Sequence, residues 1–446
     1  MAHKKFEKNQ TIATNDGDVQ ILDVLGEGGQ GCVYLVSYQG SQYALKAYID
    51  RPSKEFELNL KENVEKGSPC SSFLWPKKML TFKDADGNEA IGYLMDLRKS
   101  NFVSFISYLT AKSPFKDTYT LVTWCINLCY AFKKLHEKGY SYQDLNDGSF
   151  FLDQNTGDVL VCDNDNVSAN KKSLGILGKM KYMAPEIVRR DLAKNGEPQM
   201  PDVHSDRFSL AVVLFLALCL GNPFEGERLK DYDMIDENAE YELYGKDPVF
   251  VYSRNDNSNR PIRGYHVAVL RRWPLLPAYV KDAFHRTFTE GLSDRENGRT
   301  TEIEWIRLLS QFRDELVTCD SCGNQYVYGF EEAKQNGSCP FCNSPTKTFC
   351  TLTIDKSRIV LEPDKKIYET HIDKYSSEYN RAIGVVIRSR SNPGIWGIRL
   401  MTQGPVMIED THGTKKTIEP GGVIPIVKGL KISFSENVVG EIKIKE

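Results

Sequence analysis

Four of the eleven cysteines stand in two CxxC pairs, Cys319 with Cys322 and Cys339 with Cys342, with sixteen residues between the pairs. Each CxxC turn presents two thiolates to one tetrahedral zinc ion, so the two turns supply a complete ligand set. Because no ligand position stays open, the spacing predicts a structural zinc site. The other cysteines are scattered singly, which indicates a reducing, cytoplasmic setting rather than a disulfide framework.

A second group of residues suits phosphate chemistry. Gly26, Gly28 and Gly31 form a GxGxxG string between two strand-like segments. A glycine string between strands favours a hairpin whose backbone N–H groups close over phosphates, and it does not fit the strand-to-helix dinucleotide fingerprint. Lys46 follows on the next strand-like segment, and its compact ammonium suits phosphate oxygens. Such a lysine needs a carboxylate to hold it. Glu62 is the preferred candidate, and the competing candidates are Glu55, Glu57 and Glu65.

Five further strings follow in order along the chain. They are YQDL (142–145) with Ser149, DND (163–165), APE (184–186), DRFSL (206–210) and GRT (298–300). Together with the glycine string and Lys46 they have the order and spacing of the protein kinase motifs over residues 18–316. The chain therefore resembles the protein kinase family, whose catalytic machinery these motifs carry.

This resemblance implies a role for each matching residue. Lys46 would hold the α- and β-phosphates of ATP and pair with Glu62, and Asp144 would accept the proton of a serine or threonine hydroxyl on a protein substrate. Asp163 would bind Mg²⁺, with Ser149 at the position of the second metal ligand. The residues implied to contact the nucleotide are Gly26, Gly28, Gly31, Val33, Ala44, Lys46, Met95, Asp96, Leu97 and Phe151. Glu186 and Arg299 would form a structural ion pair, and Asp206 would brace the catalytic loop.

The chain also departs from the family pattern. Ser149 replaces an asparagine, Asn146 replaces the lysine of the catalytic loop, and Asn164 replaces the phenylalanine that follows the metal-binding aspartate. Lys179 stands where serine/threonine kinases usually have a threonine facing that loop lysine. Our hypothesis is that Lys179 delivers the missing cation from the opposite side of the cleft. These departures keep open a second interpretation, a pseudokinase that binds nucleotide without turnover.

The elements that must position these residues form two lobes. Alternating or β-branched segments predict strands near 19–25, 32–38, 43–48, 78–82 and 90–96, and apolar residues at helical spacing predict a helix over 53–66. Helical periodicity dominates residues 102–316. The prediction is an α+β, two-lobed kinase domain at 1–316, with an N-lobe near 12–97 and a C-lobe near 98–316. The most apolar run, 210–220, is too short to span a bilayer and predicts a buried helix.

The tail predicts two smaller domains, a zinc ribbon over 317–348 and an all-β sandwich over 349–446. The strings at 418–426 and 429–434 resemble the last strands of forkhead-associated domains, which bind phosphothreonine. Arg388 and Arg390 are candidates for phosphate contacts there, and a solvated loop is the plainer interpretation. A third functional interpretation is therefore a phosphopeptide-binding adaptor that acts through this domain.

The surroundings of the catalytic aspartates also resemble one group of kinases. The YxDL string and the CDNDNV string at 162–167 are similar to those of kinases in bacterial tellurite-resistance-associated phosphorylation triads. That resemblance implies a von Willebrand A-type protein and a PP2C-type phosphatase as partners. The formal net charge of −3 argues against a general nucleic-acid binder, and no membrane segment is expected.

Overall fold

The computed structural model describes residues 5–172, 178–193, 196–328 and 337–445. The chain divides into two compact units, one of residues 1–115, 131–270 and 282–303, and one of residues 116–130, 271–281 and 304–446. The second unit joins short stretches of the helical region to the cysteine-rich and C-terminal segments. This division does not coincide with the expected boundary at residue 316, so that domain boundary stays a prediction.

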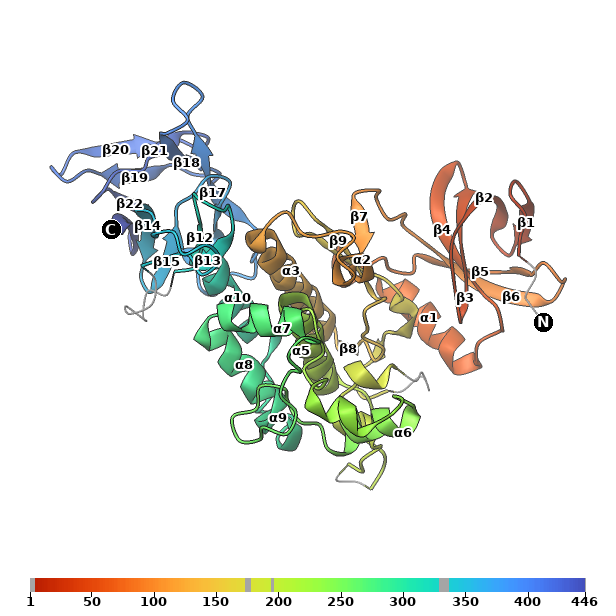
Figure 1. Cartoon of the computed structure of the whole chain (residues 1–446). Helices are drawn as coiled ribbons and strands as arrows, with labels where there is room; N and C mark the ends of the chain where they lie inside the picture. The colour runs from red at the N-terminus through yellow and green to blue at the C-terminus, as the bar shows by residue number, and fades with distance from the viewer. Residues whose placement is uncertain (1–4, 173–177, 194–195, 329–336, 446) are drawn as a thin grey trace. The chain divides into compact units, whose positions relative to one another are not determined.

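A closed barrel occupies the N-terminal part of the first unit, with strand order β1-β2-β3-β4-β6-β5 (Figure 1). One helix, α1, follows β4. Its first turn is capped by Ser53, whose side chain accepts a hydrogen bond from the Phe56 amide, and it ends at Gly67 with a positive φ of 70°. The elements are β1 (Thr11–Thr14), β2 (Gly17–Gly28), β3 (Gly31–Tyr38), β4 (Ser41–Tyr48), α1 (Lys54–Lys66), β5 (Lys78–Lys83) and β6 (Glu89–Met95).

Helices dominate the middle of the chain. The run predicted as a buried helix is the C-terminal part of α5, most of whose residues are buried and whose N-terminus is closed by a capping box between Asp202 and Ser205. Two small sheets, β10-β9-β7 and β11-β8, lie among the helices. The helices are α2 (Phe105–Leu109), α3 (Thr118–Glu137), α4 (Pro185–Val188), α5 (Val203–Cys219), α6 (Glu237–Glu240), α7 (Val267–Arg272), α8 (Ala278–Phe288), α9 (Glu290–Ser293) and α10 (Glu302–Asp314). The strands are β7 (Phe102–Ser104), β8 (Tyr140–Ser141), β9 (Phe150–Asp153), β10 (Val159–Val161) and β11 (Ser168–Ala169).

The C-terminal segment forms a hairpin and two larger sheets. The hairpin consists of β12 (Leu316–Thr318) and β13 (Gln325–Val327). The two sheets, β15-β14-β23-β22-β19-β20 and β16-β17-β18-β21, share one hydrophobic core to which Leu352 and Ile442 contribute from the first sheet and Val386 and Ile424 from the second. The strands are β14 (Phe349–Ile354), β15 (Ser357–Val360), β16 (Lys366–Tyr368), β17 (Ala382–Arg388), β18 (Trp396–Leu400), β19 (Val406–Glu409), β20 (Lys415–Ile418), β21 (Val423–Pro425), β22 (Lys431–Ser435) and β23 (Val438–Lys445).

Buried polar contacts join these sheets to the helix ends of the same unit. The Arg313 guanidinium, at the end of α10, lies 3.9 Å from the centre of the Tyr368 ring. A carboxylate oxygen of Asp314 lies 2.8 Å from Nε2 of His371. The Lys366 amide donates to the hydroxyl of Tyr119 in the first turn of α3. The C-terminal sheets therefore pack on the ends of α3 and α10 through specific contacts.

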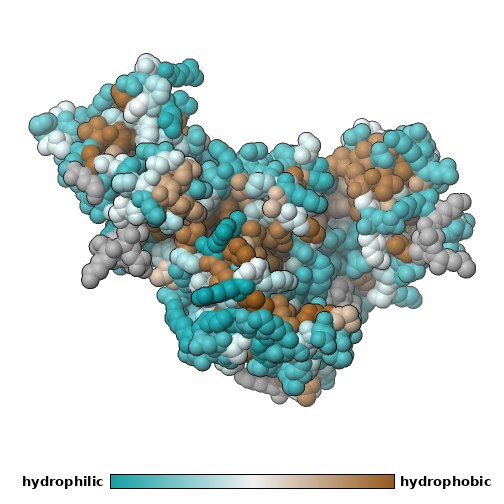
Figure 2. Space-filling model, in the orientation of Figure 1, coloured by the Kyte–Doolittle hydropathy of each residue, from teal (hydrophilic) through white to brown (hydrophobic). Residues whose placement is uncertain are grey.

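The predicted α+β class is confirmed, with a β-rich N-terminal part, a helical middle, a four-cysteine cluster and C-terminal sheets. Within the described ranges, none of the helices has the length and apolar character needed to cross a membrane. The face drawn in Figure 2 is largely hydrophilic, with separate hydrophobic areas between the polar ones.

Candidate active site

Lys46 lies on β4 and is almost completely buried, with 6% of its surface exposed. Its Nζ is 2.8 and 3.1 Å from the two carboxylate oxygens of Asp165 and 3.5 Å from Oδ1 of Asp163. Nζ also donates to Oε1 of Gln30, at the tip of the glycine-rich hairpin, at 3.3 Å. Burial lowers the pKa of Lys46, but the carboxylates of Asp165 and Asp163 outweigh burial and hold that pKa above its usual value. Lys46 is therefore a charged ammonium beside two carboxylates.

Asp165 is the main partner of Lys46, although the sequence pointed elsewhere. Its carboxylate is fully buried and accepts hydrogen bonds from the Tyr48 hydroxyl at 2.6 Å and the Tyr93 hydroxyl at 3.1 Å, besides those from Lys46. Burial raises the pKa of Asp165, but the charge and hydrogen bonds of Lys46 and the hydrogen bond from Tyr48 prevail and lower it. Asp165, Tyr48 and Tyr93 were not among the predicted site residues. The available signal was a carboxylate at 165, where the kinase motif has glycine.

The expected pairing of Lys46 with Glu62 is not found, and this expectation needs correction. Glu62 lies on the exposed side of α1 and forms an ion pair with Lys66 at 3.4 Å. The face of α1 that is turned inward carries Asn59 and Asn63 instead, and both side-chain amides donate to the Val167 carbonyl, at 2.7 and 2.8 Å. Helix α1 therefore contacts the segment after Asp163 through neutral groups.

Residues 163–167 form hydrogen bonds with several neighbouring elements. Asp163 has a left-handed backbone conformation, with φ of 54°, and its side chain is half exposed. The next residue, Asn164, is buried, and its amide donates to the carbonyls of Leu74 at 2.9 Å and Val161 at 2.8 Å. The Asn164 amide therefore makes hydrogen bonds at the position where the family motif has a phenylalanine ring. Asp163 is left as the carboxylate with free surface, which fits a metal ligand.

Asp144 lies in a tight loop over residues 142–149. The Asn146 amide donates to its Oδ1 at 3.1 Å and to its backbone carbonyl at 3.2 Å. Burial is the main cause that raises the pKa of Asp144, and the negative charge of Asp163 adds to it. A carboxyl with a raised pKa is a better proton acceptor, as a general base requires. Asp206 accepts the Tyr142 amide at 2.6 Å, which confirms the expected brace on this loop.

Ser149 and Lys179 occupy different surroundings near this loop. Ser149 is buried, and its Oγ donates to the Asp144 carbonyl at 3.3 Å. The same Oγ accepts a hydrogen bond from the backbone N–H of Asn146 at 3.3 Å. The Ser149 hydroxyl is therefore engaged within the loop. Lys179 is half exposed and its Nζ lies 2.8 Å from Oδ1 of Asp147, a loop carboxylate that the sequence analysis did not single out. The positive charge of Lys179 also acts to lower the pKa of Asp144 against the dominant effect of burial. Lys179 is therefore a half-exposed cation whose observed partner is a carboxylate of this loop.

Four of the residues expected to contact the nucleotide belong to one hydrophobic cluster. Ala44 and Met95 are neighbours across β4 and β6 and are buried, and Val33 and Leu97 pack against the same cluster. Phe151, on β9, lies under the Arg98 guanidinium, 4.5 Å from the centre of its ring. Asp96 is exposed, and a carboxylate oxygen lies 2.6 Å from Nζ of Lys77. The Asp96 carboxylate is therefore exposed and paired with Lys77, and it is not part of the hydrophobic cluster.

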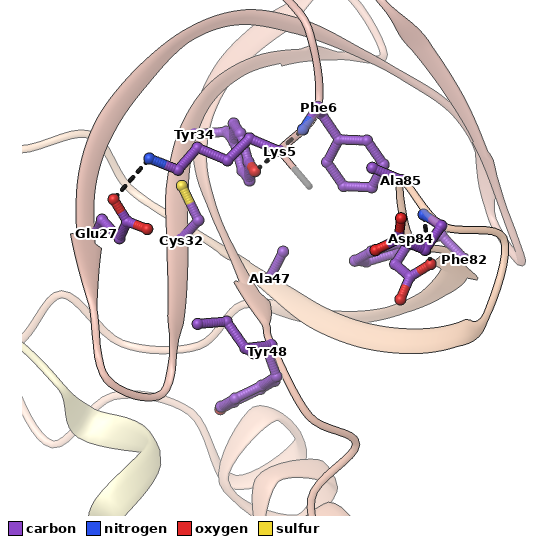
Figure 3. Close-up of a pocket in the computed structure, with 12 residues that line it drawn as sticks. Lys5, Phe6, Glu27, Cys32, Tyr34, Ala47, Tyr48, Phe82, Asp84 and Ala85 are labelled. Carbon is purple, nitrogen blue, oxygen red and sulfur yellow. Dashed lines mark hydrogen bonds and ion pairs between the residues drawn. The ribbon is translucent and has the colours of Figure 1, made fainter. Parts of the chain in front are cut away.

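The glycines of the hairpin have two different surroundings. A Cβ at Gly31 would lie 2.3 Å from the Ala47 carbonyl oxygen, so this position requires glycine for strand packing. At Gly26 and Gly28 a Cβ would meet nothing within 4 Å, which leaves the backbone open to a ligand. A separate pocket lies at the end of the barrel, where Lys5 reaches Glu27 (Figure 3). None of the residues predicted to bind nucleotide lines that pocket.

A buried ion pair stabilises the helical part. Nη1 and Nη2 of Arg299 donate to the two oxygens of Glu186 at 2.8 and 2.7 Å, which confirms the expected pair. Burial raises the pKa of Glu186, but the hydrogen bonds and charge of Arg299 prevail and lower it.

The four cysteines of the CxxC pairs come together in the second unit. All four sulfurs lie within 4.8 Å of one another, and the pairs Cys319–Cys342 and Cys322–Cys339 have sulfur separations of 3.6 and 3.7 Å. Tetrahedral zinc with Zn–S bonds of about 2.3 Å needs sulfur separations of about 3.8 Å, so the residues fit this metal. Gly323 and Asn343, each four residues after the first cysteine of its pair, both have positive φ, so the two turns match.

The candidate phosphate-binding loop of the C-terminal sheets is exposed. Arg388 and Arg390 lie at the end of β17, and the Arg388 guanidinium sits 5.6 Å from the centre of the Trp396 ring. This placement fits the solvated-loop interpretation as well as a binding one.

Comparison with known proteins agrees with this geometry. Residues 19–248 match the family described as Protein kinase domain, which is more than half of the chain. The chain belongs to the protein kinase family.

Two relatives show how far the similarity extends. Protein kinase YegI of Escherichia coli K12 is 25% identical over 328 residues, which cover 70% of this chain and 48% of YegI. Human ribosomal protein S6 kinase alpha-3 is 24% identical over 219 residues, which cover 48% of this chain and 28% of that kinase. The chain thus matches about half the length of YegI and less of the S6 kinase.

Proposed function

We propose that this chain transfers the γ-phosphoryl group of ATP to serine or threonine of a protein partner. The observation that carries the proposal is the approach of the Lys46 ammonium to within 3.5 Å of the half-exposed Asp163 carboxylate. Phosphoryl transfer depends mainly on positioning and on neutralising the charge of the phosphates, which this pair suits. The similarity to S6 kinases supports the serine/threonine preference.

Each residue has a distinct part in this mechanism. Lys46 would hold the phosphate oxygens, and the open backbone at Gly26 and Gly28 would close over them. Asp163 would hold Mg²⁺, which when bound neutralises charge on the phosphates. Asp144 would orient the hydroxyl of the substrate and accept its proton. Ser149 is proposed as a second metal ligand, and its engagement within the loop makes it the weaker of the two.

The test is phosphotransfer from ATP carrying a labelled γ-phosphate, measured with casein as a generic acceptor. We expect Mg²⁺-dependent labelling of serine and threonine, and a loss of about 10²–10⁴-fold in Asp144→Asn. Mg-ATP binding by the wild type without any transfer would instead establish the pseudokinase alternative, which the replacements at Asn146 and Ser149 keep in view. Phosphoamino-acid analysis separates serine and threonine from tyrosine.

We assign a structural zinc ion to the four-cysteine cluster, within a ribbon over 317–348 that precedes a separate β-domain. The matched turns and the sulfur separations of 3.6 and 3.7 Å support this assignment. Metal analysis of the purified chain should find one zinc per molecule. Cys342→Ser should lower the zinc content, whereas Cys350→Ser should keep it, since Cys350 is outside the cluster. A chain that folds without zinc would overturn the assignment.

The proposed partners are a von Willebrand A-type protein and a PP2C-type phosphatase. Support comes from the resemblance of the strings at 142–145 and 162–167 to triad kinases. Co-expression with such a pair should give a phosphorylated von Willebrand A-type protein that the phosphatase reverses. An unmodified protein in the presence of active kinase would reject this partner.

A further inference from the structure

The position of Lys46 depends on a carboxylate that is not on helix α1. We propose that Asp165 positions Lys46 for phosphate binding, so that the lysine and the metal ligand Asp163 are held by one segment and helix α1 supplies no charge to the site. This inference rests on the proposed function, because it concerns how the same lysine is made ready for ATP.

Helix α1 has no carboxylate available for this task. Its buried face is formed by Phe56, Asn59, Leu60 and Asn63. Asn59 and Asn63 donate to one backbone carbonyl, that of Val167, and a neutral amide cannot balance an ammonium.

The acidic residues of α1 lie elsewhere. Glu57 pairs with Arg51 at 2.8 Å, and Glu62 pairs with Lys66 at 3.4 Å. Glu55 and Glu65 are exposed. The helix would have to rotate about its axis to bring any of them to Lys46.

Three side chains of the barrel instead converge on Asp165. Lys46 and Tyr48 are two residues apart on β4 and so point to the same side of the strand. Tyr93, on β6, is the direct cross-strand partner of Lys46. Their ammonium and two hydroxyl groups all reach the Asp165 carboxylate, between 2.6 and 3.1 Å.

Such a pocket is specific for a charged group. Burying a carboxylate without partners is strongly unfavourable, and two tyrosine hydroxyls in an apolar core also need acceptors. The two tyrosines and Asp165 therefore satisfy one another, while Lys46 provides the balancing charge. A glycine at 165, as in the family motif, would leave all three barrel groups without this acceptor.

The consequence concerns regulation. Asp165 is two residues after Asp163, and Asn164 between them is tied to the Leu74 and Val161 carbonyls. Lys46 and Asp163 are therefore positioned together whenever this segment is in place. A shift of α1 would break the amide contacts to Val167 but would leave the Lys46–Asp165 pair intact. The site is assembled without an activating movement of α1.

The experiment compares Asp165→Asn with the matched variant Glu62→Gln, each of which exchanges one carboxylate for an amide of the same shape. Mg-ATP binding is measured by calorimetry, and kcat and KM for ATP by phosphotransfer. Asp165→Asn should weaken Mg-ATP binding by about tenfold and lower kcat/KM by about 100-fold, whereas Glu62→Gln should stay within about twofold of wild type. The reverse pattern would overturn the proposal.

A second readout does not depend on activity. NMR of lysine labelled with ¹³C at Cε, with Lys46→Arg to assign the signal, reports on the surroundings of the Lys46 ammonium at one fixed pH. The Lys46 signal should shift in Asp165→Asn, which removes its nearest carboxylate, and should keep its position in Glu62→Gln. An unchanged Lys46 signal in Asp165→Asn rejects the proposal whatever the enzyme does. If wild type binds no Mg-ATP, the proposed function fails while this measurement still decides the role of Asp165.

A milder variant covers the case in which Asp165→Asn does not fold. Tyr93→Phe removes one hydrogen bond to Asp165 and keeps the ring in the core. It should lower kcat/KM by about three- to tenfold with a normal circular dichroism spectrum. A Tyr93→Phe protein with wild-type kinetics and an unshifted Lys46 signal would contradict the proposed role of Asp165.

Discussion

The Glu186–Arg299 pair and the Lys46–Asp165 pair are both buried, but they differ in their balance of charge. Arg295 lies 3.3 Å from Glu186 and also pairs with Asp202, so that network contains two carboxylates and two guanidinium groups. Two further hydrogen bonds from Arg299 reach the carbonyls of Gly291 and His204. The charges are therefore matched within this network, as expected of a structural one.

The cluster around Lys46 has one cation for two carboxylates. Asp165 is enclosed, but Asp163 is half exposed and its charge is shared with a lysine that already has a partner. The surplus negative charge lies at the open edge of the cluster, where a cation can approach. In this chain, a buried ion pair whose charges fail to cancel therefore indicates a functional site.

The largest effect should come from unbalancing the matched network. Glu186→Gln leaves Arg299 and Arg295 without their shared carboxylate, and loss of one partner of a buried pair costs about 3–5 kcal/mol. Unfolding by urea at pH 7 measures this loss.

Removal of a carboxylate from the cluster around Lys46 should not lower the free energy of unfolding. Asp163→Asn removes surplus charge, so its free energy of unfolding should equal or exceed that of wild type while phosphotransfer is lost. Equal destabilisation by Glu186→Gln and Asp163→Asn would show that the two clusters do not differ as argued.

A second buried network with matched charges, around His136, should lose its stabilising effect as the pH rises. His136 lies between Asp206 and Glu302, at 3.1 and 2.9 Å, and Arg207 also contacts Glu302. Burial lowers the pKa of His136, but the two carboxylates prevail and raise it from 6.5 to about 9. The network is therefore balanced only while His136 is protonated.

Since the folded pKa is above the unfolded one, the stabilisation is complete below pH 6.5 and is lost as pH rises through about 9. The free energy of unfolding should fall by about 3 kcal/mol between pH 6 and pH 9.5. His136→Gln should remove most of this dependence, and the same slope in both proteins would assign it to other groups. Burial raises the pKa of Glu302, but His136 and Arg207 prevail and lower it to about 2. Glu302 therefore does not titrate between pH 6 and pH 9.5.

The Glu186–Arg299 pair was predictable from the sequence, whereas Arg295, Asp202 and half of the cluster around Lys46 were not. Glu186, Arg299 and Asp206 stand in short strings whose partners are set by the family's fold, so their contacts followed from the motifs. Lys46 and Asp163 were brought together for the same reason.

The partner of Lys46 was missed because it depends on which face of α1 is turned inward. Phe56 and Leu60 mark that face, and residues 59 and 63 lie on it at helical spacing. Glu62 is two positions after Leu60, about 200° around the helix, and so lies on the opposite side. The apolar pattern of α1 therefore places Glu62 away from the barrel, although its spacing from Lys46 favours it as a partner.

Tyr48 and Tyr93 could not be found from motifs, because their role is set by strand pairing. Their hydroxyls reach Asp165 only when β4 and β6 are neighbours in the observed register. The signal in the sequence was limited to the additional carboxylate at 165. A buried acidic residue in place of the motif glycine needs a cation to balance its charge, and Lys46 is the cation that pairs with Asp165.

Lys179 offers a third case, an exposed ion pair beside the active site, and should give the smallest effect. Its Nζ is 2.8 Å from Asp147, but its side chain is half exposed, and such pairs contribute between 0 and about 1 kcal/mol to stability. If Lys179 supplies the cation that Asn146 cannot, Lys179→Met should lower kcat by about tenfold while KM for ATP and the midpoint of urea unfolding stay near wild type.

Lys181→Met is the matched control, because Lys181 carries the same charge two residues further on and packs over the Tyr182 ring. Its kcat should remain within about twofold of wild type. Similar losses in both variants would mean that the general positive charge of this segment matters and that Lys179 has no individual role. A loss of stability in Lys179→Met alone would mean that the Lys179–Asp147 ion pair is structural. The distinction between balanced and unbalanced clusters would then not apply to exposed ion pairs.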